Sequence, residues 1–229
     1  MTTISANLQA VKRRIIDACS AAGRDPATVT LLAVSKTFPA AALRKAHDCG
    51  QRAFGESYVQ EALAKQAQLA DLELEWHFIG PLQSNKTRAV AENFAWVHSV
   101  DRLKIAERLS AQRPDHLPPL NVCVEVNIGG EASKSGCAPH EAPAFCRAVA
   151  KLPRLRLRGL MTIPAPMPDS ALVRRQFAQL RVLCERIRHD GLELDTLSMG
   201  MSGDLEEAIL EGATIVRVGT AIFGERIKP

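Results

Sequence analysis

Short apolar runs alternate with longer amphipathic stretches along almost the whole sequence. This alternation limits the folds open to the chain more than any other feature. Eight runs have the length and the branched, apolar content of buried strands, and no linker or break in composition separates them. Repeated strand–helix units of this kind predict a parallel sheet covered by helices. The predicted strands are 30–36, 52–56, 74–80, 95–100, 119–128, 155–163, 194–200 and 213–218.

The number of units decides between two parallel architectures. A doubly wound sheet carries a GxGxxG turn, which is absent here, whereas eight units close into a barrel. We therefore expect one α/β domain over residues 1–229, a (β/α)8 TIM barrel with an extra N-terminal helix at 4–22. Ser57 with Gln60 predicts a capping box, and Asp101 predicts another helix N-cap. The remaining helices are expected at 39–50, 57–70, 84–93, from 101 onward, 139–151, 170–189 and 204–211.

Composition is typical of a folded globular chain. Apolar residues make up 46% of the 229 residues and charged residues 24%, close to the average for soluble domains. The 29 basic and 25 acidic residues are interspersed and give a net charge of only +4. Arg154, Arg156 and Arg158 form the densest basic stretch, but leucines alternate with them as in a solvated strand edge. We therefore expect no nucleic-acid partner.

Targeting segments and metal motifs are also missing from the sequence. The N-terminus has no apolar core of a signal peptide, and no apolar run approaches the ~18 residues that a membrane span needs. The six cysteines show neither a CxxC pair nor a Cys/His zinc spacing. We expect a cytoplasmic protein with reduced thiols, no membrane association and no metal.

The first predicted strand ends in a lysine. Active sites of such barrels lie at the C-terminal ends of the strands. Lys36 closes the apolar run LLAVS, and an amine in apolar surroundings has a lowered pKa, which favours imine formation. The alternative is a rim lysine that reaches water or pairs with a carboxylate. The strand pattern alone does not decide between them.

The loops after the last two strands are rich in small residues. Barrels often bind phosphate with these two loops, because small residues let backbone N–H groups approach an anion. Strand eight is adjacent to strand one in a closed barrel, so this cradle would lie beside Lys36, about one pyridoxal ring away. Ordinary turns also favour such residues, so either loop alone is weak evidence. The residues concerned are Gly200, Ser202, Gly203, Gly219 and Thr220.

A second charge interrupts an apolar run near these loops. Arg217 lies within IVRV, where an unpaired guanidinium would be costly to bury. One interpretation is a structural salt bridge. The other is that Arg217 faces the pyridine nitrogen of bound pyridoxal phosphate.

Two further patterns are not interpreted as catalytic. GMSGD resembles the nucleophile elbow GxSxG, but that motif needs glycine where this chain has Asp204. His77 and His98 lie within strand patterns and are expected to be hydrogen-bonded core or rim histidines.

Several motifs, taken in their order and spacing, match one family over essentially the whole chain. The chain resembles the pyridoxal phosphate homeostasis proteins, the YggS family, and through them the N-terminal barrel of alanine racemase. The motifs are LLAVSKTFPA, FGESYVQEA, WHFIGPLQSNK, HSVDR, NIGGEASKSG, GLMTIPAP, SMGMSGDLEEAI and VRVGTAIFGER.

The resemblance implies pyridoxal 5'-phosphate as cofactor and gives its residues their roles. It makes Lys36 the aldimine lysine and Arg217 the residue that faces the pyridine nitrogen. It also implies that four residues surround the phosphate: Met201, Ser202, Gly219 and Thr220. The family more often has Asn at Ser57 and Asp at Gly203. Ser57 therefore weakens the inference that the side chain at this position makes the family's contact. Gly203 leaves phosphate binding intact, because glycine only eases the approach of the backbone to the phosphate.

Three functions remain open from the sequence. The first is a binding protein that holds the cofactor reversibly and buffers it or delivers it to apo pyridoxal-phosphate enzymes. The second is a pyridoxal-phosphate-dependent racemase or related enzyme with weak activity. A racemase needs a second acid/base, and Tyr58 is the only tyrosine. An arginine at the ring nitrogen also weakens carbanion stabilisation, so we expect the binding role rather than catalysis. The third is a Schiff-base aldolase without cofactor.

Overall fold

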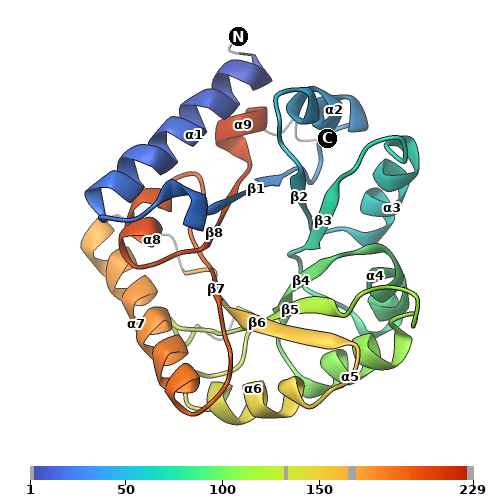
Figure 1. Cartoon of the computed structure of the whole chain (residues 1–229), viewed down its shortest axis with the longest axis vertical. Helices are drawn as coiled ribbons and strands as arrows, with labels where there is room; N and C mark the ends of the chain where they lie inside the picture. Colours follow the sequence, from blue (N-terminus) through green and yellow to red (C-terminus); the bar gives the residue numbers. More distant parts are fainter. Residues whose placement is uncertain (1–2, 132–133, 165–168, 226–229) are drawn as a thin grey trace.

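Eight parallel strands form a closed barrel in the computed structural model, which describes residues 3–131, 134–164 and 169–225 (Figure 1). The strands pair in the order of the sequence, and β1 pairs with β8 to close the barrel. The predicted (β/α)8 TIM barrel is confirmed. The strands are β1 Thr30–Val34, β2 Ala53–Glu56, β3 Glu75–Phe78, β4 Trp96–Val100, β5 Leu120–Glu125, β6 Leu155–Met161, β7 Thr196–Ser198 and β8 Ile215–Val218.

Helices surround this barrel, and an extra helix precedes the first strand as predicted (Figure 1). This helix, α1, packs on the outside against α2, α8 and α9. The helices are α1 Ile4–Ala21, α2 Ala40–Asp48, α3 Val59–Gln68, α4 Thr87–Asn93, α5 Leu103–Gln112, α6 Ala142–Ala150, α7 Ser170–His189, α8 Leu205–Leu210 and α9 Thr220–Phe223. Two 3₁₀ turns, η1 Pro26–Thr28 and η2 Ser84–Lys86, lie between them.

The apolar core has two layers. The larger lies between the strands and the surrounding helices, where residues such as Leu43, Leu109 and Phe177 are completely buried. The smaller fills the barrel interior and consists mostly of residues from six of the strands, among them Leu32 and Trp96. The interior is therefore packed with side chains and is not a pore.

Neither Ser57 nor Asp101 caps a helix, so both N-cap predictions are wrong. Helix α3 begins at Val59, two residues after Ser57, and has no side-chain cap. Ser57 instead packs closely against Gly80. A Cβ added at residue 80 would lie only 2.6 Å from the Ser57 carbonyl oxygen. Helix α5 begins without a side-chain cap, because the Asp101 carboxylate accepts hydrogen bonds from Arg102. At Asp101 a neighbouring arginine occupies the capping carboxylate, and at Ser57 the helix begins too late for this residue to be its N-cap.

Two other differences concern short elements. The helix expected at 84–93 begins with the 3₁₀ turn η2 before α4. The sequence predicted no helix after Val218, but α9 follows β8. A helix of four residues is too short for hydrophobic periodicity to reveal.

All six cysteines are free thiols. Within the described ranges, no group of three His, Cys, Asp or Glu side chains could hold a metal ion. No described helix is long and apolar enough to cross a membrane.

One backbone contact between β6 and β7 requires glycine. Gly159 pairs with Thr196, and a Cβ at 159 would lie 1.7 Å from the Thr196 carbonyl oxygen. The obstacle is backbone of the barrel itself, so neither strand can give way without disturbing its hydrogen bonds. The spacing of β6 and β7 therefore leaves room only for glycine at position 159.

Gly159→Ala should destabilise the barrel, because it forces two paired strands apart. We expect the free energy of unfolding to fall by about 1 to 3 kcal/mol or more, measured by urea denaturation. Gly203→Ala is the matched control, since nothing lies within 4 Å of a Cβ there. Equal stability of the two variants would contradict this account of the strand contact.

Candidate functional site

Lys36 lies in the turn that follows β1. The sequence predicted that it would end the strand, but β1 ends at Val34. The turn runs from Ser35 to Phe38, whose N–H donates to the Ser35 carbonyl at 3.0 Å. Lys36 is partly buried, and Thr37 after it has a φ of +72°, in the left-handed region. The lysine thus keeps its predicted place at the carboxyl end of the barrel.

The loop after β8 passes directly beside the end of β1. A Cβ at Gly219 would lie 3.1 Å from the Val34 carbonyl oxygen, so the backbones approach closely. The exposed Thr220 begins α9, which ends at Phe223. The Phe223 ring stacks on Phe38, with centroids 5.0 Å apart and planes at 30°. The structure therefore brings the lysine-bearing turn and the predicted second phosphate loop together.

The loop after β7 joins the same end of the barrel. The Ala221 N–H donates to Ser202 Oγ at 3.4 Å and links this loop to the start of α9. The Met201 N–H donates to Asp204 Oδ1 at 2.5 Å, so this backbone donor already has a partner. Gly203 is exposed between them. The predicted cradle therefore consists of two neighbouring loops in contact.

The extra helix α1 supports both loops. The Arg14 guanidinium donates to the Ser202 carbonyl at 3.0 Å and to the two Glu206 oxygens at 2.6 and 2.8 Å. Asn7 donates through its side-chain amide to the Ile222 carbonyl at 2.9 Å. The sequence predicted the helix but could not show that it holds the two loops.

Arg217 lies in the barrel interior and is 3% exposed. It donates to Ser198 Oγ and to the Thr162 carbonyl, each at 2.8 Å. Its partners among the described residues are thus a hydroxyl and a carbonyl, which does not support the interpretation as a structural salt bridge. Burial lowers the pKa of Arg217 to about 10, while Asp204 and Glu125 oppose the decrease. It remains a cation at neutral pH.

A chain of buried side chains leads away from Arg217. Ser198 Oγ lies 2.7 Å from His98 Nδ1, His98 Nε2 lies 2.9 Å from His77 Nδ1, and His77 Nε2 lies 2.7 Å from Glu75 Oε1. Burial lowers the pKa of both histidines, so they are neutral. Every group in the chain is satisfied when all the hydrogen bonds are donated in one direction, from the Arg217 guanidinium towards the Glu75 carboxylate. The prediction that both are hydrogen-bonded core histidines is confirmed.

A small cavity opens at the carboxyl ends of β3, β5 and β6. Its volume is about 230 Å³. Burial raises the pKa of Glu125 to about 7, Asp101 adds to the increase and Arg217 opposes it. The sequence does not single out Glu125, because a glutamate at the end of a strand carries no distinct signal. The cavity is lined by Ile79, Pro81, Glu125, Val126, Asn127, Lys134, Ser135 and Ile163.

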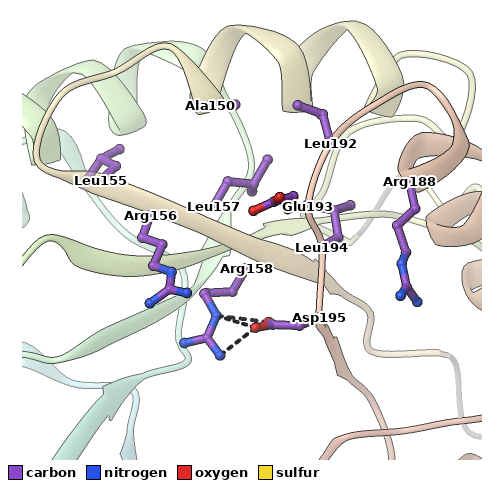
Figure 2. A pocket seen from close by; sticks show the side chains of 10 residues that line it. All are labelled: Ala150, Leu155, Arg156, Leu157, Arg158, Arg188, Leu192, Glu193, Leu194 and Asp195. Carbon is purple, nitrogen blue, oxygen red and sulfur yellow. Dashed lines mark hydrogen bonds and ion pairs between the residues drawn. The ribbon is translucent and has the colours of Figure 1, made fainter.

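A larger cavity of about 730 Å³ lies at the opposite, amino-terminal ends of β6 and β7 (Figure 2). Here the Arg158 guanidinium binds both Asp195 oxygens at 2.8 to 3.0 Å and lies 4.7 Å from the Trp96 ring centroid. Arg154 pairs with Asp115 at 2.8 Å. The arginine-rich edge is thus largely committed to ion pairs, which suits the structural role of this face.

Comparisons with known proteins agree with this geometry. The family model described as "Alanine racemase, N-terminal domain" matches residues 6–227. The pyridoxal phosphate homeostasis protein of Pseudomonas aeruginosa is 66% identical over 99% of this chain and 97% of its own. The protein of the same name from Escherichia coli is 54% identical over 99% and 98%.

A solved structure extends the likeness to three dimensions. PipY of Synechococcus elongatus, determined with PLP bound, is 39% identical to this chain, with a TM-score of 0.85. The likeness covers 97% of this chain and 100% of PipY. The chain therefore belongs to the family of the pyridoxal phosphate homeostasis proteins, whose barrel is that of the alanine racemase N-terminal domain.

Proposed function

We propose that this protein binds pyridoxal 5'-phosphate reversibly through Lys36 and takes part in vitamin B6 homeostasis in the cytoplasm. Its role would be to hold the cofactor or deliver it to apo enzymes that need it. Relatives at 66% and 54% identity are named for this homeostasis, and PipY binds PLP. We also infer that residues 1–229 act as one domain, because all eight strands belong to one barrel.

The observation that carries this proposal is the buried Arg217. Two of the roughly five N–H groups of a guanidinium donate to Ser198 and Thr162, and no described carboxylate pairs with it. A buried cation without a carboxylate suits a neutral acceptor such as the pyridine nitrogen. The residues present therefore fit the cofactor. When bound, pyridoxal phosphate supplies an aldehyde that reacts reversibly with a primary amine.

The phosphate would lie between the loops after β7 and β8. Ser202 and Thr220 offer hydroxyls there, and Gly219 keeps the space beside β1 free of a side chain. Because the Met201 N–H donates to Asp204, we assign Met201 to shaping the loop around the phosphate rather than to donating from its backbone.

Two features favour binding over efficient amino-acid chemistry. Arg217 would keep the ring nitrogen an acceptor, which weakens the stabilisation of negative charge on a substrate carbon. Tyr58, the only tyrosine, is 55% exposed at the start of α3, and its hydroxyl takes part in none of the hydrogen bonds among the described residues. An acid/base catalyst needs a fixed position near the proton that it moves.

Lys36→Ala should abolish covalent attachment of the cofactor and keep the fold, because the residue lies in a turn beyond the packed barrel. Mass spectrometry of the borohydride-reduced protein would measure the pyridoxyl adduct and identify its residue. Circular dichroism would check the fold. An adduct at undiminished stoichiometry in this variant would move the attachment to another lysine, and Lys134 would be examined next.

Ser202→Ala and Thr220→Ala should each weaken retention of pyridoxal phosphate by about tenfold or more, since a hydrogen bond to a charged group is worth about 1.5 to 3 kcal/mol. Titration of the apo variants would give the dissociation constants. Thr30→Ala, at the opposite end of β1, removes an exposed hydroxyl and should change nothing. Unchanged affinity in both site variants would place the phosphate elsewhere.

Arg217→Glu tests the distinction between binding protein and enzyme. A carboxylate at 217 would favour a protonated ring nitrogen, so α-proton exchange of added amino acids should rise in the variant that still binds the cofactor. Exchange into deuterated solvent, followed by NMR, measures it. The wild type should exchange far more slowly than an ordinary turnover of roughly 1 to 1,000 per second. Fast exchange in the wild type would favour the weak racemase instead.

A further inference from the structure

Two charged residues of α3 hold the backbone on both sides of Lys36. Glu61 Oε1 accepts the Thr37 N–H at 2.5 Å. Lys65 Nζ donates to the Ser35 carbonyl at 2.8 Å. The two side chains are one helical turn apart and are joined to each other at 2.5 Å. The peptide groups before and after Lys36 are thus both tied to the same ion pair.

This ion pair is anchored in the interior. Lys65 is 4% exposed, and its ammonium also donates to Glu56 Oε1 at 2.8 Å. Ser35 donates through its hydroxyl to the same oxygen at 2.6 Å. Burial raises the pKa of Glu56, while its contacts with Lys65 and Ser35 oppose the increase. A lysine buried to this extent must be paired, so the cluster has little freedom to rearrange.

The turn itself needs such support. Its hydrogen bond from Phe38 to Ser35 makes Lys36 the second residue and Thr37 the third. A positive φ at the third position marks a type II turn, which normally has glycine there. Thr37 is β-branched, and its φ of +72° is therefore strained. The Thr37 N–H belongs to the central peptide of the turn, the group whose orientation distinguishes type II from type I.

We propose that Glu61 and Lys65 are positioning residues for Lys36. By fixing the two peptide groups that flank it, they set the direction in which the Lys36 side chain leaves the turn. The inference rests on the proposed attachment of the cofactor to Lys36, and it adds the residues that orient the reacting amine. Neither residue is assigned a contact with the cofactor.

The test compares two ligands of the apo protein. Pyridoxine 5'-phosphate carries an alcohol in place of the aldehyde, so it shares the phosphate and ring contacts but does not react with a lysine. Glu61→Ala should weaken binding of pyridoxal 5'-phosphate by about tenfold and leave binding of pyridoxine 5'-phosphate unchanged. A merely structural effect on the barrel mouth would weaken both ligands alike.

Three controls sharpen this comparison. Glu61→Gln keeps a carbonyl oxygen for the Thr37 N–H and should restore part of the affinity. Glu61→Ala in a Lys36→Ala background should have no further effect, because there is no amine left to orient. Glu185→Ala removes a glutamate from a surface i,i+4 pair on α7, with Arg181 at 3.0 Å, and should match the wild type.

The outcomes separate this inference from the proposed function. If the wild type gives no reduced adduct on Lys36, the proposed function fails. If it gives one, and Glu61→Ala either binds both ligands normally or weakens both equally, the positioning role is overturned. Should Glu61→Ala not fold, the double variant Glu56→Gln with Lys65→Met removes the buried charges together. That variant must show the same selective loss for the proposal to stand.

Discussion

The pairing of β8 with β1 is the interaction on which the candidate site depends. Leu32 pairs with Arg217 and Ala33 with Val218, so the last strand lies alongside the first. Because all strands are parallel, the loops that follow them meet at one end of the barrel. Closure thus joins the turn at Lys36 to a loop that lies more than 180 residues later in the sequence.

The interior of the barrel is apolar in part and is crossed by a polar chain. Buried polar groups are costly unless they are hydrogen-bonded, and each step from Arg217 to Glu75 has a partner within 2.9 Å. The carboxylate at the end of this chain is 49% exposed, so it retains contact with water. Arg217 is thereby held in place by a hydroxyl and a carbonyl rather than by an ion pair with a described carboxylate.

Helix α3 shows where inference from the sequence was limited. The pattern predicted the helix, yet its start was wrong: α3 begins at Val59, and Ser57 lies before its N-cap position, packed against Gly80. The pattern also could not distinguish the buried Lys65 from a surface lysine, since its place in a glutamate–lysine i,i+4 pair is typical of exposed helix faces. Only the packing of α3 against the ends of β1 and β2 buries that charge and gives it the Ser35 carbonyl.

The sequence by itself determined the barrel and the residues that carry the proposed chemistry. Eight strand–helix units with no break leave few architectures, and a lysine after the first strand with small residues after the last two indicates a phosphate-bearing cofactor. The tertiary structure decided which groups hold these residues. Strand periodicity and turn composition are local properties, whereas the partners of Arg217, of Ser202 and of the turn at Lys36 come from segments distant in the chain. Such partners become defined only when the barrel closes.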